Sequence, residues 1–145
     1  MKSVDEMAIE GLVQTFVDGW NAGDGTALAR AFALDADFTA ITGLKAKGRD
    51  VIAKGHNEIL STIYRGTVNS AKIETIRFLR IDVAVADVTF RFSGDMRPFG
   101  LQQTSCGIVC TKENGTWSIE VFRNMVPFGR PIAGPVEQEL AASNG

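Results

Sequence analysis

Residues 83–93, VAVADVTFRFS, decide the fold of this chain. The even positions of this stretch are all apolar, whereas the odd positions begin with valine and become polar from Asp87 onward. Because side chains alternate across a β-strand, the pattern predicts a strand with one dry face and one mixed face. We therefore expect it to lie in a sheet that covers a core on one side only.

Further β-type runs surround this stretch, and short polar breaks separate them. Such spacing is typical of strands joined by hairpins, so residues 68–124 predict an antiparallel meander. The expected strands are 71–80, 83–93, 101–112 and 116–124.

The chain before the meander predicts helices. Residues 3–22 and 50–63 place apolar side chains at the 3, 4, 7 spacing of amphipathic helices, with His56 on the apolar stripe of the second one. A shorter helix at 26–33 is expected to stop at Asp35-Ala36-Asp37, before short strands at 38–41 and 44–47. Helices followed by a curved antiparallel sheet make an α+β arrangement.

The length of 145 residues fits one domain with an ordinary core. We expect this domain to occupy residues 1–126. Residues 127–145 contain three prolines within their first nine positions and predict a C-terminal arm that packs on the body or on a neighbour.

Charge and hydropathy argue against two classes of partner. The net charge of −2 arises from 15 basic and 17 acidic residues that are interspersed, and no basic block indicates nucleic acid or an anionic membrane surface. No apolar run approaches the roughly 20 residues of a membrane span. Three acidic residues near the N-terminus also argue against a signal peptide, so we expect a cytoplasmic protein.

The two cysteines and the single histidine limit the redox and metal chemistry that we expect of the chain. Cys106 and Cys110 lie four residues apart on an expected strand, which places their Cα atoms ~13 Å apart and too far for a disulfide. We expect both to be reduced core residues. One histidine and no paired cysteines give no metal-ligand spacing, so neither a metal nor a cofactor is expected.

Several short motifs follow one another in a recognisable order and spacing. They are WNAGD at 20–24, LARAFA at 28–33, DADF at 35–38, GRDVI at 48–52 with His56 after it, IRFL at 76–79, DVAVA at 82–86 and GTWSI at 115–119. Together they resemble the nuclear-transport-factor-two-like superfamily, and within it the SnoaL-like and SgcJ/EcaC-type members, over residues 4–126.

This resemblance implies a cystatin-like α+β cone, in which N-terminal helices pack on a curved antiparallel sheet around an internal pocket. Members of the superfamily include isomerases, dehydratases, polyketide cyclases and non-catalytic modules, so the fold selects no single chemistry. One activity is disfavoured. The steroid isomerases of the superfamily carry a base and two oxyanion donors at positions that would fall on Ala40, Phe16 and near Ile108, all apolar here.

The resemblance also implies which side chains face the pocket. His56 is the catalytic candidate, either as a general base or, in the alternative, as a core histidine with its hydrogen bonds satisfied. Asp37 could orient the imidazole, although strand alternation with an inward Phe38 argues against that pairing. The other expected pocket residues are Phe16, Trp20, Phe38, Tyr64, Val88, Phe90, Thr104, Ile108 and Asn124.

Two functions follow from these residues. The first is binding of a small hydrophobic or aromatic molecule with cofactor-free cyclase, lyase or isomerase chemistry, in which His56 moves the proton and Asn124 or Thr104 polarises a carbonyl. The second is a non-catalytic homodimeric module that binds a ligand or a protein. With either function we expect a homodimer through the outer face of the sheet, because the helices can cover only one of its faces. A carboxylate within hydrogen-bond reach of His56 would favour the enzyme.

Overall fold

The computed structural model describes residues 1–97 and 100–127, and nearly all of the predicted C-terminal arm falls outside them. The three described helices lie within residues 4–61 with two strands between the second helix and the third, and four longer strands follow them. The elements are α1 (Val4–Asn21), α2 (Gly25–Ala29), β1 (Phe32–Thr39), β2 (Lys45–Lys47), α3 (Arg49–Ser61), β3 (Val68–Arg80), β4 (Val83–Ser93), β5 (Gln103–Glu113) and β6 (Thr116–Met125).

The strands form a sheet with the order β2-β1-β6-β5-β4-β3. The run from β3 to β6 is the predicted antiparallel meander, which is confirmed. β1 adds to the β6 side in the parallel direction, and β2 pairs antiparallel with β1 at the edge. The predicted α+β cone is likewise confirmed by this arrangement of helices and sheet.

The start of β1 is the main error of the sequence-based assignment. β1 begins at Phe32, inside the stretch predicted as a helix, and continues through Asp35-Ala36-Asp37. Phe32 pairs with Ile119 and Asp37 with Val121, so a shift of register between them accommodates the extra residues of β1. Because Phe32 is fully buried, its packing and its pairing with β6 outweigh the local signal of the acidic residues.

All three helices are held close together by two glycines. A Cβ atom at Gly19 would lie 2.4 Å from the backbone nitrogen of Leu28, and one at Gly25 would lie 2.5 Å from the carbonyl oxygen of Ala53.

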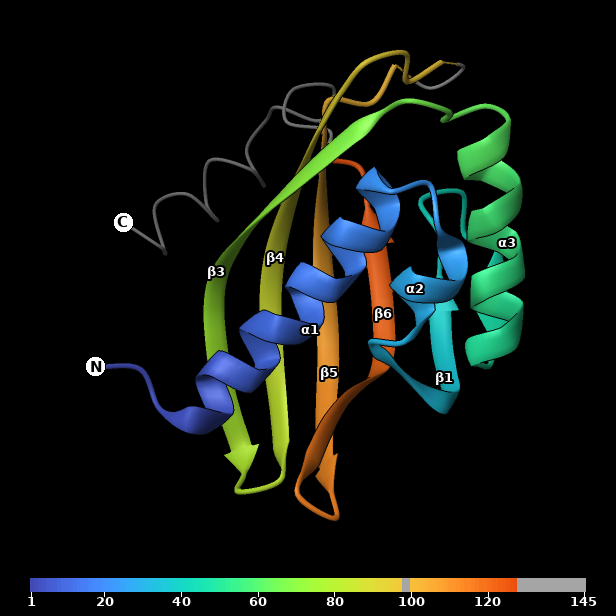
Figure 1. Cartoon of the computed structure of the whole chain (residues 1–145). Coiled ribbons are helices and arrows are strands. Elements are labelled where there is room, and N and C mark those ends of the chain that lie inside the picture. The colour runs from blue at the N-terminus through green and yellow to red at the C-terminus, as the bar shows by residue number, and fades with distance from the viewer. Residues whose placement is uncertain (98–99, 128–145) are drawn as a thin grey trace.

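Figure 1 shows α1 crossing one face of the sheet and α3 standing beside β1. None of the helices in the described residues is long and apolar enough to cross a membrane.

The sheet face under α1 is the inner, core face. In one cross-strand row Ile76, Ala86, Ile108 and Phe122 lie side by side, and the alanines of β4 leave room for the helix. Cys106 and Cys110 also point inward, are free and buried, and burial raises the pKa of the Cys110 thiol to about 12. On the opposite, outer face, residues such as Asp87, Ser105 and Arg123 are exposed.

The N-terminal end of α1 is tied to the β5–β6 hairpin by one carboxylate. Asp5 Oδ1 accepts a hydrogen bond from the Trp117 indole at 2.8 Å and from Lys112 Nζ at 3.1 Å. These two donors, with the indole first, lower the pKa of Asp5. This one carboxylate oxygen joins the start of α1 to the hairpin at the edge of the core, where the Asp5 and Lys112 side chains are 35% and 36% exposed.

Candidate functional site

A cavity of about 410 Å³ lies between α1, α3 and the inner face of the sheet at the other end of the molecule. Most of the side chains expected to face a pocket line it, namely Phe16, Trp20, Phe38, His56, Tyr64, Phe90, Thr104 and Asn124. Val88 and Ile108 point to the same face of the sheet but lie in the core outside the lining of the cavity.

Aromatic rings form much of the cavity wall. Phe16 of α1 lies 5.2 Å from Phe90 and 5.1 Å from Phe122, measured between ring centroids. Phe38 stacks on Phe122 at 4.7 Å, so β1, β6 and α1 share one aromatic cluster. A wall of this kind favours an apolar or aromatic ligand over a sugar or a nucleotide.

His56 is buried on the cavity side of α3, with 6% of its surface exposed. Its Nδ1 atom lies 2.8 Å from the Ile52 carbonyl oxygen one turn earlier. A carbonyl can only accept, so the Nδ1 atom must carry the proton and Nε2 keeps its lone pair in the neutral ring. Burial lowers the pKa of His56 and favours this neutral form.

The structure does not bring Asp37 to His56. The Asp37 carboxylate forms an ion pair with Lys47 at 3.1 Å on the outer side of β1, where about half of the Asp37 side chain is exposed. Strand alternation turns Phe38 inward instead, and the Phe38 ring meets the imidazole edge-on at 5.1 Å. Among residues 1–97 and 100–127 no carboxylate is hydrogen-bonded to His56, and no cluster of three potential metal ligands is present.

Two polar side chains on the cavity floor have atoms without a hydrogen-bond partner among the described residues. They are Thr104, whose Oγ1 atom is buried in a residue 1% exposed, and Asn124, whose Oδ1 atom is buried. Asn124 pairs across the strands with Cys106, two residues from Thr104, so both side chains lie on the inner face. Buried polar atoms are almost always hydrogen-bonded, so these two are candidates for ligand contacts.

The remaining polar groups of the wall are Trp20 and Tyr64. The Trp20 indole donates to Thr67 Oγ1 at 3.1 Å, so its only donor is already used. Burial raises the pKa of Tyr64, which keeps its phenol protonated. The two rings lie 5.8 Å apart and close one side of the cavity.

The mouth of the cavity contains residues that the sequence analysis did not single out. Leu44, Val51 and Ile63 line it and are 74%, 52% and 48% exposed. Lys45 and Glu58 stand at the same rim. Exposed apolar side chains beside β2 and α3 were visible in the sequence, but no periodicity marked them as a shared rim because Leu44 precedes β2 whereas Val51 and Ile63 lie in and just after α3.

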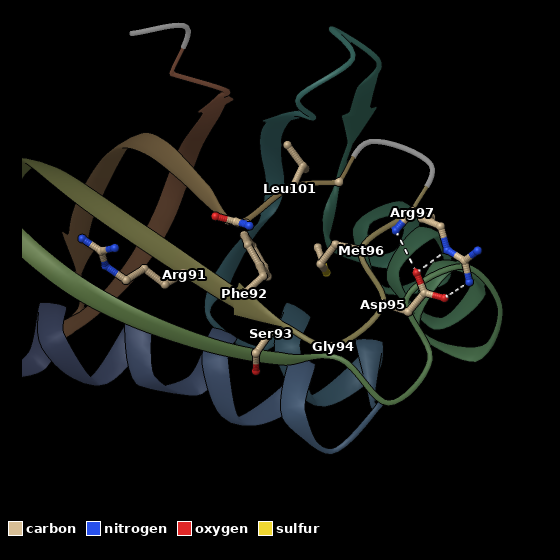
Figure 2. Close-up of a pocket in the computed structure, with 10 residues that line it drawn as sticks. Arg91, Phe92, Ser93, Gly94, Asp95, Met96, Arg97 and Leu101 are labelled. Atoms are coloured by element: carbon tan, nitrogen blue, oxygen red, sulfur yellow. Dashed lines mark hydrogen bonds and ion pairs between the residues drawn. The ribbon is translucent and has the colours of Figure 1, made fainter.

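A second hollow of about 620 Å³ lies at the connection between β4 and β5 (Figure 2). Phe92, Met96 and Leu101 line both this hollow and the main cavity, so they form a common wall. Figure 2 shows Arg91 and Arg97 pointing away to opposite sides of them. Asp95 accepts from Arg97 Nε at 2.8 Å, and this bond holds the pKa of Asp95 at about 2. This hollow is more polar and carries no unpartnered buried group in the described residues.

Solved structures share this fold. One is a domain of unknown function with a cystatin-like fold from Nostoc punctiforme PCC 73102, with a TM-score of 0.79 and 25% identity over 99% of this chain and 86% of that chain. Another is an uncharacterized protein with a cystatin-like fold from Caulobacter vibrioides, with a TM-score of 0.78 and 24% identity over 93% and 96%.

A third similar structure is hexachlorocyclohexane dehydrochlorinase LinA-type3 from Novosphingobium barchaimii LL02, with a TM-score of 0.75 and 15% identity over 90% of this chain and 92% of that chain. No protein-family model and no curated protein matches the sequence. The structural likeness confirms that the chain has the cystatin-like fold of the nuclear-transport-factor-two-like superfamily. Its narrower placement among SnoaL-like members stays a prediction.

Proposed function

We propose that the chain binds a small hydrophobic or aromatic molecule in the cavity between α1, α3 and the sheet. One observation carries this proposal: Thr104 and Asn124 have buried oxygen atoms without partners at the floor of a cavity walled by aromatic rings. An unpartnered buried oxygen costs stability, and a bound ligand would satisfy it. The size of the cavity is at the lower end of the range for small-molecule sites.

Cofactor-free lyase, isomerase or cyclase chemistry is the catalytic form of this proposal. His56 is neutral, and its Nε2 atom can accept a proton from a bound substrate. The Ile52 carbonyl holds the ring in the required tautomer but supplies no full negative charge to stabilise an imidazolium. The site therefore supports binding more strongly than catalysis. Ketosteroid isomerisation is not proposed, because Ala40 and Phe16 line the cavity where that reaction needs a carboxylate and a phenol.

The test is a binding titration with two aromatic probes, 2-naphthol and 2-acetonaphthone, followed by NMR of the single histidine. We expect at least one probe to move the His56 ring signals of the wild type. Ala40→Phe places a ring in the cavity and should weaken that binding at least tenfold, because the two rings cannot occupy the same space.

The matched control is Ser105→Leu, an enlargement on the outer face of β5 that leaves the cavity unchanged. Thermal unfolding of both variants shows that each is folded. Failure of both probes to bind at their solubility limits, or equal binding by wild type and Ala40→Phe, would contradict the proposed function.

A second candidate function is a homodimeric module that associates through the outer face of the sheet. Val85, Val109 and Val121 lie side by side in one cross-strand row on that face, each half-buried, and provide an apolar centre among polar neighbours. Light scattering should then report a dimer for the wild type and a monomer for Val109→Lys. A wild type that is monomeric at all concentrations measured would exclude this association.

A further inference from the structure

We infer that the cavity selects a ligand that donates hydrogen bonds, a hydroxylated aromatic compound such as a phenol or a naphthol, through acceptor atoms on His56, Thr104 and Asn124. This inference rests on the proposed function, since it names the chemical class that the cavity would bind. It differs from the expectation that these side chains polarise a carbonyl, because a carbonyl needs donors.

His56 provides an acceptor whose direction is fixed by the helix. The proton on Nδ1 is committed to the Ile52 carbonyl at 2.8 Å, so the neutral ring can offer only the lone pair of Nε2. Nε2 has no hydrogen-bond partner among the described residues, and its ring neighbours are Phe16, Trp20 and Phe38. None of these rings presents a donor to it, because the Trp20 indole is held by Thr67. A ligand hydroxyl can fill this position, whereas a ligand carbonyl would meet the lone pair and be repelled.

The sheet provides the second group of acceptors. Asn124 presents Oδ1, which can only accept, and Thr104 presents a hydroxyl that can accept or donate. The two residues are diagonal neighbours on adjacent strands, roughly 7–8 Å apart between Cα atoms, so one ring substituent can approach both. A ligand hydroxyl can donate to Asn124 Oδ1 or to Thr104 Oγ1, and a ligand with two hydroxyls could satisfy both buried oxygens.

The cavity wall correspondingly contains few hydrogen-bond donors. Lys45 and the Thr42 hydroxyl stand at the exposed rim, and the Tyr64 phenol and the Thr104 hydroxyl are the uncharged donors in the buried part of the described wall. Rotation of the Asn124 amide by 180° would add its N–H group, so this residue alone does not set the preference. The fixed His56 tautomer does, because no rotation turns its Nε2 atom into a donor while the ring is neutral.

The experiment compares three naphthalenes of similar size by calorimetry and fluorescence: 2-naphthol, 2-methoxynaphthalene and 2-acetonaphthone. Only 2-naphthol can donate. We expect it to bind the wild type roughly tenfold or more tightly than the methyl ether and the ketone, since its hydroxyl can donate to one of these acceptors and the other two probes can donate to none.

Three variants at Thr104 and Asn124, on the cavity floor, test which atoms bind 2-naphthol. Thr104→Val should weaken 2-naphthol binding severalfold and leave the ether unaffected, while Thr104→Ser retains the hydroxyl and should bind like the wild type. Asn124→Asp replaces the amide nitrogen by an oxygen. If the ligand donates to this residue, 2-naphthol binding should survive that change, whereas binding through the amide N–H group would be lost.

The outcomes separate the two proposals. Equal binding of all three probes, or tighter binding of the ketone, would overturn the donor preference while leaving the cavity as a binding site. Absence of binding by every probe would contradict the proposed function itself. Loss of 2-naphthol binding in Asn124→Asp, with the variant folded, would show that the amide donates and would also contradict this inference.

Discussion

The two ends of the inner sheet face differ in how their polar groups are satisfied. At the end covered by the first turns of α1, the Trp117 indole and Lys112 both donate to Asp5, and the surrounding rows of the sheet are filled by small and branched apolar side chains. At the other end, Thr104 and Asn124 keep buried oxygen atoms without partners, and His56 keeps the lone pair of Nε2. The same strands run through both ends.

This difference indicates that the two ends of the inner sheet face have separate roles. The closed end contributes to stability, because the indole of the buried Trp117 regains with Asp5 the hydrogen bond that it lost from water. The open end has more hydrogen-bond acceptors than donors, so it adds less to the free energy of unfolding than a fully paired site would. Functional sites of proteins commonly have such a cost in stability. The comparison predicts that substitutions at the two ends will have opposite consequences.

The largest effect on stability is expected at Ile108, in the closed part of the core. Ile108→Ala removes a side chain that is 1% exposed and leaves a void beneath α1, so the free energy of unfolding should fall by about 2–5 kcal/mol. Urea unfolding measures this change. Val109→Ala, on the half-exposed outer face next to it, is the matched control and should cost clearly less. Equal losses in the two variants would mean that the inner face is not the core.

A smaller effect is expected from the protonation of His56. Its pKa in the folded protein lies below the ordinary value of 6.5, so the unfolded chain binds a proton more readily than the folded one. The contribution of His56 to the free energy of unfolding is therefore complete above pH 6.5. It is lost as the pH falls from 6.5 through the lower pKa that His56 has in the folded protein.

Chemical unfolding at a series of pH values from about 7 to about 5 tests this, since no other side chain titrates at its ordinary value in that window. The chain has a single histidine, so His56→Gln removes the whole effect. We expect the stability of the wild type to decline over this range and that of His56→Gln to stay nearly constant. A wild type with no decline would show that His56 is accessible to water.

The smallest effect is expected at Thr104, in the open end. Thr104→Val exchanges a hydroxyl without a partner for a methyl group of the same shape, so stability should change by less than about 1 kcal/mol and in the favourable direction. Thermal unfolding in the absence of ligand measures it, with Thr104→Ser as the control that keeps the hydroxyl. A large loss of stability in Thr104→Val would show that the hydroxyl is already bonded in the free protein.

The sequence predicted the central strands of the sheet well because β4 and β5 are long and alternate buried with more exposed residues. Residues 83–93 were assigned with the bounds that the structure shows for β4. The inward direction of Phe90, Thr104 and Asn124 was implied by the resemblance to the superfamily, and all three side chains line the cavity. β1 was misplaced because its identity depends on parallel pairing with β6, a contact between residues nearly ninety positions apart that no local pattern records.

The site was harder to predict than the fold. The position of His56 on the apolar stripe of α3 was visible, but its tautomer depends on the Ile52 carbonyl, which only the folded backbone places. Asp37 was considered as a partner because it resembles a motif position, and its ion pair with Lys47 became evident only when β2 was paired with β1. Val88 and Ile108 face inward as expected, yet the packing around them decides that they do not reach the cavity.

The most direct test of the contrast between the two ends is a ¹⁵N NMR spectrum of the His56 ring at neutral pH, recorded without and with 2-naphthol. We expect a neutral ring protonated on Nδ1, with an Nε2 signal that shifts as 2-naphthol binds. A ring protonated on Nε2, or an Nε2 signal that does not move while 2-naphthol binding is saturated, would contradict this expectation. The cavity end would then hold no free acceptor on α3.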